Sequence, residues 1–418
     1  MSPPELLARF DFVSFDPRGV GESTPVRCFA SLAEQQTFFS SVPPFPIAAS
    51  EEQAFIDAYR DADRRCLKRN ARLLPHVSTA NVARDMDLLR QALGESSLTY
   101  LGASYGTYLG TTYANLFPDR VRALALDGAV DPVAYATGRD DETDRVPTFL
   151  RLTSHVGASQ VMGQFLRLCA DAGPSRCPFA VGTDRQATTS RLDILMARLR
   201  EHPLPVVTPQ GTVQLTYARV VAAVGGNLYF QAAFPSLALA LQQLDQGDGT
   251  LMARLGQLLT PPTSYDNSHE AAAAVVCADS DNPASPRDWP PAAHAADRQA
   301  PYFGSPFAYT SFACADWKVR DRDRYAGPFN RPTANPILVV GTTFDPATPY
   351  AGAVALTHDL ANARLLTLNG WGHTALGQPS TCAHEAEVRY LVDLTLPAPG
   401  LVCKPDIGPF ETVPGAIG

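Results

Sequence analysis

The chain has 418 residues, of which 45% are apolar and 18% are charged, so it can bury a large core and is not disordered. Its 42 acidic residues exceed its 34 basic ones, and this net charge of −8, without a cluster of Lys and Arg, argues against a nucleic-acid partner. The longest unbroken apolar stretch, Ala271 to Ala278, is far shorter than the roughly 18 residues of a membrane span, so no span is expected.

The first 135 residues predict alternating strands and helices. The apolar run 10–15 (FDFVSF) is expected to be a buried strand, because Pro17 and Gly19 follow it and end it. After it we expect a helix over 79–93, a strand over 98–101, a helix over 107–116 and a strand over 121–126. Strands and helices that alternate at this pace indicate a parallel sheet with helices on both faces.

The alternation stops between about residues 136 and 325 and then returns. Helical patterns dominate this middle part, over 149–170, 190–201 and 236–244, and six prolines between Pro283 and Pro306 indicate an irregular stretch. The strand and helix pattern then resumes with 336–341, 349–360, 363–368 and 382–394. We therefore predict a core in two parts, 1–135 and 326–418, with an inserted, mainly helical lid domain over 136–325.

Eight cysteines are spread along the chain without a zinc-like spacing. Pairing sequence neighbours would give four disulfides, which predicts an oxidising compartment, but eight free thiols are almost as plausible on the count alone. The four pairs would be 28–66, 169–177, 277–314 and 382–403. The first residues, MSPPELLARFDF, lack the cationic lead and apolar core of a secretory signal.

The segment Gly102-Ala103-Ser104-Tyr105-Gly106 matches the pattern G-x-S-x-G between a predicted strand and a predicted helix. In that context a sharp turn lifts the Ser104 side chain above the sheet, and the glycines let neighbouring backbone pass. The start of the helix places the backbone N–H of Tyr105 where a developing oxyanion would sit. The alternative is an ordinary turn between a strand and a helix.

A serine nucleophile needs a histidine base and a carboxylate that orients it. Among eight histidines, His373 alone follows a predicted strand in a Gly-Trp-Gly-His loop near the C-terminus. Asp345 follows the predicted strand 336–341, and it could also be no more than a turn former before Pro346. Because parallel strands end at one edge of a sheet, we expect Ser104, Asp345 and His373 to meet there.

Three blocks of sequence resemble the α/β-hydrolases that comprise the actinobacterial tripeptidyl aminopeptidases and, more distantly, the proline iminopeptidases. The blocks are 12–23 (FVSFDPRGVGES), 100–107 (YLGASYGT) and 345–349 (DPATP) with 370–373 (GWGH). The resemblance extends over nearly the whole chain and implies an α/β-hydrolase fold with a helical lid. It implies Ser104 as nucleophile, His373 as general base, Asp345 as its orienting residue and Tyr105 as an oxyanion donor.

The resemblance also implies secretion or a place at the cell surface, and it implies no cofactor and no metal. The family pattern has an earlier strand ending in a Gly-Gly-Pro-Gly loop, which supplies the second oxyanion N–H and is absent from this sequence. We therefore expect that N-terminal strands are missing and that Met1 is an internal start of a longer protein.

The leading hypothesis is a serine exopeptidase that acts on a peptide substrate near its free N-terminus through an acyl-enzyme. A carboxylesterase with the same triad is the first alternative, because the fold and the triad do not determine the substrate. A non-catalytic, truncated homologue is the second. An acidic side chain that holds the substrate ammonium would favour the peptidase, and the candidates are Glu22 and Asp279, although either could be a solvated surface carboxylate.

Overall fold

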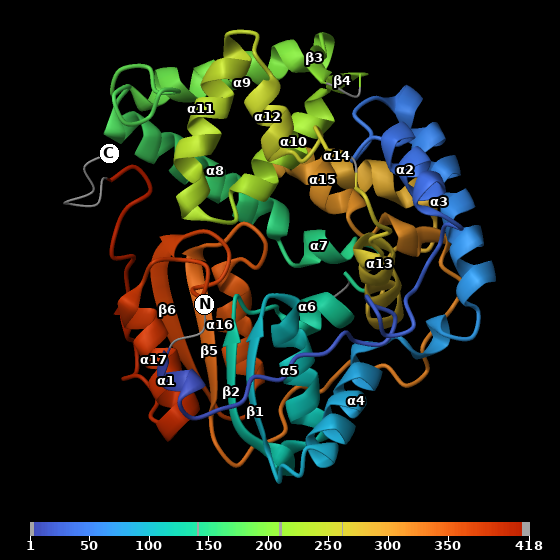
Figure 1. Cartoon of the computed structure of the whole chain (residues 1–418), viewed down its shortest axis with the longest axis vertical. Coiled ribbons are helices and arrows are strands. Elements are labelled where there is room, and N and C mark those ends of the chain that lie inside the picture. Colours follow the sequence, from blue (N-terminus) through green and yellow to red (C-terminus); the bar gives the residue numbers. More distant parts are fainter. Residues whose placement is uncertain (1–3, 140–141, 209–210, 261, 412–418) are drawn as a thin grey trace.

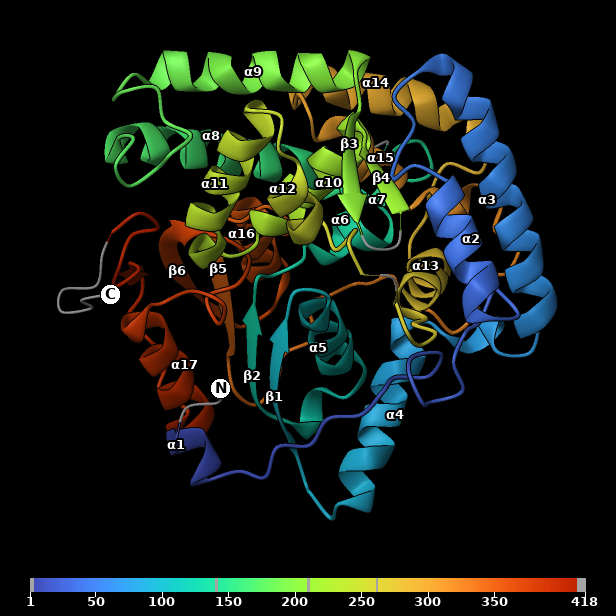
Figure 2. The same cartoon turned by 45° about the horizontal axis from the view of Figure 1, so that its top comes forward.

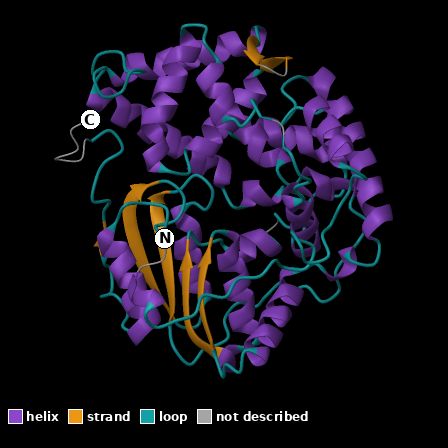
Figure 3. Cartoon of the chain, viewed as in Figure 1, coloured by secondary structure: helices purple, strands orange, loops and turns teal. Residues whose placement is uncertain are grey.

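The computed structural model describes residues 4–139, 142–208, 211–260 and 262–411. A sheet flanked by helices occupies the lower half of Figure 1, and a larger, mostly helical part lies above it and to its right. Figure 3 shows the same division by secondary structure. The strands are β1 (Leu98–Ala103), β2 (Val121–Asp127), β3 (Leu204–Thr208), β4 (Gly211–Leu215), β5 (Ile337–Phe344), β6 (Ala363–Trp371) and β7 (Val402–Cys403).

The main sheet has the order β1-β2-β5-β6-β7, and every neighbouring pair is parallel. The strands expected at 98–101, 121–126, 336–341 and 363–368 are β1, β2, β5 and β6. The parallel α/β sheet predicted from the sequence is therefore confirmed. Its carboxyl edge collects the segments that follow β1, β2, β5 and β6.

Alternate residues of the strands pack against helices on opposite faces of the sheet. Leu124 and Leu126 of β2 share a core with the helices of one face, whereas Ala123 and Ala125 face the other side. The helices of the first face are α4 (Thr79–Ala92), α5 (Tyr105–Leu116) and α16 (Tyr350–Asp359). Those of the second face are α1 (Pro4–Leu7) and α17 (Thr381–Asp393).

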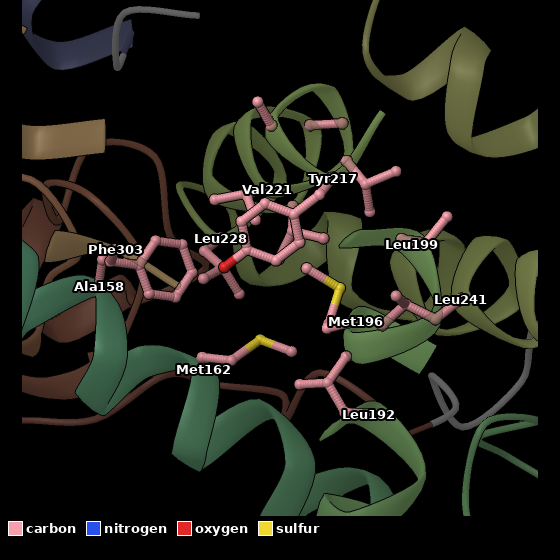
Figure 4. Packing of buried hydrophobic residues seen from close by; sticks show 14 of the residues in the cluster. Ala158, Met162, Leu192, Met196, Leu199, Tyr217, Val221, Leu228, Leu241 and Phe303 are labelled. Carbon is pink, nitrogen blue, oxygen red and sulfur yellow. The ribbon is translucent and has the colours of Figure 1, made fainter. Parts of the chain in front are cut away.

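The helical part has its own core, and the hairpin β3–β4 is attached to it. Its helices are α6 (Pro132–Ala136), α7 (Thr148–Arg151), α8 (Ser154–Ala172), α9 (Arg185–Glu201), α10 (Tyr217–Asn227), α11 (Phe234–Asp245), α12 (Thr250–Leu255), α13 (Ser268–Asp279), α14 (Trp289–Gln299) and α15 (Gly304–Tyr309). Short 3-10 helices lie at Leu74–His76, Pro118–Arg120, Gln231–Ala233, Pro286–Asp288 and Phe312–Asp316. Figure 4 shows how Met162 of α8 and Met196 of α9 fill this core.

Two helices that precede β1, α2 (Leu32–Ser41) and α3 (Ala49–Asn70), lie beside the helical part at the right of Figure 1. Phe55 and Ile56 of α3 belong to the same buried cluster as Phe165 of α8. Segments that precede β1 in the sequence and segments that follow it therefore both contribute to the helical part. The domain boundaries at 135 and 325 stay a prediction.

The strand expected over 10–15 does not form, and that prediction was wrong. Residues 11–17 have no regular secondary structure, and Figure 2 shows this segment crossing β2 and β1 instead of following them. Phe12 and Val13 expose 52% and 55% of their surface. An apolar run becomes a strand only when a neighbouring strand accepts its backbone hydrogen bonds, and no described strand pairs with this one.

The Pro-rich stretch between Pro283 and Pro306 is more regular than expected, because it contains all of α14 and the start of α15. Pro290 and Pro291 lie in the first turn of α14, where a missing N–H breaks no intrahelical bond.

All eight cysteines form disulfides, and they pair as sequence neighbours: 28–66, 169–177, 277–314 and 382–403. The predicted pairing is confirmed and the alternative of free thiols is excluded. Cys277–Cys314 joins α13 to the segment after α15. Within the described ranges, none of the helices is long and apolar enough to cross a membrane.

Candidate active site

Ser104 sits at the turn between β1 and α5 in a strained backbone conformation. Its φ of 57° and ψ of −127° are rare for a residue with a Cβ, and such strain is typical of a turn that displays a nucleophile. A Cβ on Gly102 would lie 2.6 Å from the carbonyl oxygen of Gly106. Only glycine at position 102 therefore leaves room for the chain to turn here.

Asp345 and His373 form a buried pair at the ends of β5 and β6. Nδ1 of His373 lies 3.0 Å and 2.9 Å from the two carboxylate oxygens of Asp345. The backbone N–H groups of Ala347 and Thr348 donate to Asp345 Oδ1 at 2.8 Å and 2.9 Å, and the Thr348 hydroxyl donates to Oδ2 at 3.0 Å. Because the oxygens of Asp345 accept all of these bonds, Nδ1 of His373 is assigned as a further donor to the carboxylate, and Nε2 is left as the acceptor.

The surroundings of His373 control its charge and its position. Burial opposes the charged imidazole, but the carboxylate of Asp345 and, at longer range, that of Asp127 outweigh it and raise the pKa of His373. The backbone N–H of His373 donates to the carbonyl of Tyr229 at 2.7 Å, and the two rings lie edge to face. The helical part of the molecule thus helps to hold His373 in position, through Tyr229.

Ser104 follows β1 and His373 follows β6, at the same carboxyl edge of the sheet but with β2 and β5 between the two strands, and no hydrogen bond joins the Ser104 hydroxyl to Nε2 of His373. Nε2 is buried and bonds to no residue of the described chain. Asp127 and Gly128, at the end of β2, link the two segments. The N–H of Ser104 donates to the carbonyl of Asp127 at 2.9 Å, and a Cβ on the next residue, Gly128, would lie 3.3 Å from His373 Cε1. Nε2 is therefore an unused acceptor at the edge where the Ser104 side chain emerges.

Tyr105 begins α5, so its backbone N–H points out of the first helical turn and has no partner within the helix. This N–H lies next to Ser104 in the chain, and its role as an oxyanion donor stays a prediction. Its side chain lies elsewhere: the hydroxyl contacts the hydroxyl of Thr79, which donates to Asp279 Oδ2 at 2.5 Å.

The two candidate ammonium anchors occupy different environments. Asp279 exposes 1% of its surface, and its oxygens accept bonds from the N–H and the hydroxyl of Thr79. Burial raises the pKa of Asp279 to about 7, although the bonds from Thr79 oppose that shift. Glu22 is exposed, and its backbone N–H donates to Asp16 Oδ2. The role predicted for both carboxylates stays a prediction, and Glu22 alone is accessible to a ligand.

Three residues of the site were missed in the sequence: Asp127, Thr348 and Tyr229. Asp127 stands at the end of a buried strand, and a position at the end of a predicted strand is the signal that singled out Asp345. Gly128, which follows Asp127, has a φ of 66°. Thr348 lies three residues after Asp345, a spacing from which a hydroxyl can reach back to a carboxylate. Tyr229 comes from the helical part, and nothing local in the sequence connects it to His373.

In the described segments, no group of three or more His, Cys, Asp and Glu side chains could hold a metal ion. The parallel sheet, the strained serine turn and the Asp–His pair at its carboxyl edge define a serine hydrolase of the α/β-hydrolase class. Comparison with known proteins agrees. Residues 2–200 match the family described as alpha/beta hydrolase fold, and residues 300–403 match the family of TAP-like proteins.

Several known proteins are similar over almost the whole chain. Serine protease Hip1 of Mycobacterium tuberculosis is 33% identical, with 96% of this chain and 76% of the relative aligned. Tripeptidyl aminopeptidase of Streptomyces lividans is 30% identical, with 96% and 71% aligned. Carboxylesterase B of M. tuberculosis is 33% identical, with 96% and 75% aligned. The chain belongs to this family of α/β-hydrolases, as the resemblance of its motifs implied.

Proposed function

We propose that the protein is a serine exopeptidase that cleaves peptides near a free N-terminus, with Ser104, His373 and Asp345 as its catalytic triad. The observation that carries the proposal is the buried Asp345–His373 pair, whose free Nε2 lies at the sheet edge where the strained Ser104 turn emerges. The names of two relatives, a tripeptidyl aminopeptidase and a serine protease, support the peptidase activity.

In the proposed reaction, Nε2 of His373 takes the proton of the Ser104 hydroxyl as its oxygen attacks the scissile carbonyl. Asp345 stabilises the imidazolium that forms, and the N–H of Tyr105 donates to the oxyanion. His373 then gives its proton to the leaving amine, which leaves an acyl-enzyme on Ser104. Water, activated by His373, hydrolyses that ester and regenerates the enzyme.

A carboxylesterase is the second candidate, and the similarity to Carboxylesterase B favours it. The same nucleophile, base and oxyanion donor serve ester hydrolysis, so the two functions differ only in what binds the substrate. The four disulfides further support a secreted or cell-surface location for the protein.

The test compares a tripeptidyl arylamide, its N-acetylated form and a simple aryl ester as substrates. We expect the free tripeptide to react fastest and Ser104→Ala to remove turnover of all three while its unfolding curve stays unchanged. Equal rates on free and acetylated peptides, or fast turnover of the ester alone, would favour the esterase. An active Ser104→Ala variant would refute the triad.

Recognition of the N-terminus is tested with Glu22→Gln. If Glu22 holds the substrate ammonium, the variant loses the preference for free over acetylated peptide, because the paired charge is gone. Glu385→Gln, which changes another exposed carboxylate on α17, is the matched control. An unchanged preference in Glu22→Gln would exclude Glu22 as the anchor.

A further inference from the structure

Asp127 lies between the two segments that carry Ser104 and His373. Its carbonyl accepts the N–H of Ser104 at 2.9 Å, and its carboxylate oxygens accept the N–H groups of Ala375 and Leu376, both at 2.8 Å. A single residue at the end of β2 is thus bonded through its backbone to the nucleophile turn and through its side chain to the histidine loop. The mechanism described above does not use it.

An aspartate at the end of a strand is often only a turn former. The environment of Asp127 differs from that case, because its side chain is fully buried and both oxygens accept bonds from the loop that follows His373. The next residue packs closely under the same loop, since a Cβ on Gly128 would lie 2.7 Å from Thr374 Cγ2. Asp127 and Gly128 therefore support the loop that follows His373, through hydrogen bonds and through close packing.

A second buried carboxyl group lies behind Asp127. Glu387 of α17 exposes 3% of its surface, and neither of its oxygens bonds to any described residue. The helix α17 packs on β2, and the hydroxyl of Tyr390 accepts the backbone N–H of Leu124. Glu387 lies one turn before Tyr390 on the buried face of α17, and Asp127 lies three residues after Leu124 on β2. A charge on Asp127 therefore disfavours a second charge on Glu387.

The hydrogen bonds indicate which of the two is charged. Burial, together with the nearby Asp127, raises the pKa of Glu387 well above its usual range, and no donor compensates. Burial also raises the pKa of Asp127, and the charge of Asp345 adds to that, but the two backbone N–H groups and His373 oppose the shift. The charged groups that act on Asp127 are thus Asp345 and His373, and Asp127 in turn acts on Glu387.

We propose that Asp127 is a positioning residue that holds the Ser104 turn and the His373 loop together, and that it is the ionised member of a carboxyl pair whose neutral member is Glu387. Its negative charge then stabilises the imidazolium of His373 at longer range, while Asp345 stabilises it through the hydrogen bond at Nδ1. The groups that face His373 are Asp345, Asp127 and Tyr229. The inference rests on the proposed triad, but its decisive measurement does not require turnover.

The experiment is an NMR titration of the His373 ring in full-length protein with labelled histidine, assigned with His373→Gln. In Asp127→Asn we expect the pKa of His373 to fall by about half a unit or more, because a negative charge is removed. In Glu387→Gln, which has nearly the same shape and would remove no charge, we expect the wild-type value. A lower value in Glu387→Gln, or an unchanged value in Asp127→Asn, would overturn the proposal.

Two further measurements separate position from charge. In Asp127→Asn, kcat should fall about tenfold with KM little changed, because the residue does not touch substrate. Asp127→Glu keeps the charge and displaces it, so kcat should fall while the pKa of His373 stays near the wild-type value. If Asp127→Asn does not fold, Asp127→Glu and Glu387→Gln still decide the question. An inactive wild-type enzyme would count against the proposed function and leave the titration informative.

Discussion

Both carboxylate oxygens of Asp279 are bonded to Thr79, through its N–H at 2.8 Å and its hydroxyl at 2.5 Å. The Thr79 hydroxyl also contacts the hydroxyl of Tyr105, the residue after Ser104. The start of α4, the end of α13 and the start of α5 therefore meet at one buried polar cluster. This cluster lies directly beside the proposed nucleophile.

Replacing Thr79 by Val should destabilise the protein by about 1 to 3 kcal/mol. The shape is kept, but one oxygen of Asp279 and the hydroxyl of Tyr105 lose their partner in a buried site. Urea unfolding at fixed pH measures the loss. Thr79→Ser, which retains the hydroxyl, is the control and should cost less; equal losses in both variants would show that the hydroxyl bond contributes nothing.

The stability of the protein should rise as the pH falls from 8 to 5, and Asp279 should account for part of the effect. Its pKa is raised to about 7 in the folded protein, above its ordinary value of about 3.8 in the unfolded chain. Between these values the folded state holds a proton that the unfolded state releases, so the free energy of unfolding declines as pH rises through this range and is level above it.

Asp279→Asn removes that titration, so its unfolding free energy should depend less steeply on pH than that of the wild type. Asp127 and His373, whose pKa values are also raised, preserve a remaining slope of the same sign. Urea unfolding of both proteins at pH 5, 6, 7 and 8 tests this. Parallel curves for the two proteins, or a wild type that loses stability toward pH 5, would contradict the assignment.

The elements that position the triad could be predicted because each has a local signal. Buried strands read as apolar runs, and the pattern around Ser104 requires a strand before it and a helix after it, which are β1 and α5. Asp345 and His373 were found because each follows such a strand. Because both strands end at the same edge of the sheet, a hydrogen bond between the two residues could then be expected, and the structure contains that bond.

The features that could not be predicted depend on contacts between residues that are distant from each other in the sequence. The run 10–15 has the composition of a strand but no neighbour to pair with, and composition carries no information about a neighbour. Tyr229 reaches His373 from the helical part. Glu387 did leave a signal, because it lies at helical spacing from Ala383 and Tyr390, on the buried face of α17. A carboxylate at such a position, on the apolar face of a helix, predicts a buried ionisable group.

The pH profile of kcat/KM should rise with an apparent pKa above 6.5, because catalysis needs neutral Nε2 and the pKa of His373 is raised. Asp345→Asn removes the largest stabilising charge and the acceptor that selects the tautomer. We expect kcat to fall by about 10³ to 10⁴ and the rise to move to lower pH. A profile with the same midpoint in both enzymes would mean that His373 is not the base.

Removing the disulfide Cys277–Cys314 should cost more stability than removing Cys169–Cys177. The first closes a separation of 37 residues and the second one of 8. In the chain-entropy model these correspond to about 4 and about 2.5 kcal/mol. Paired Cys→Ser variants, unfolded in urea without reductant, give the comparison, and a larger loss for the 169–177 pair would contradict the entropic argument.

Gly102→Ala should disrupt the nucleophile turn, whereas Gly163→Ala should leave it intact. The added methyl at position 102 would lie 2.6 Å from the Gly106 carbonyl oxygen and 2.5 Å from the Tyr100 ring, and backbone at the start of α5 cannot yield without moving Ser104. We expect turnover to fall by at least about a hundredfold, since a displaced nucleophile loses its alignment with the base. Gly163, inside α8, has no atom within 4 Å of the new methyl, so its replacement should stabilise the helix by about 0.5 to 1 kcal/mol at unchanged kcat. Full activity in Gly102→Ala would show that the strained turn is not needed for the reaction.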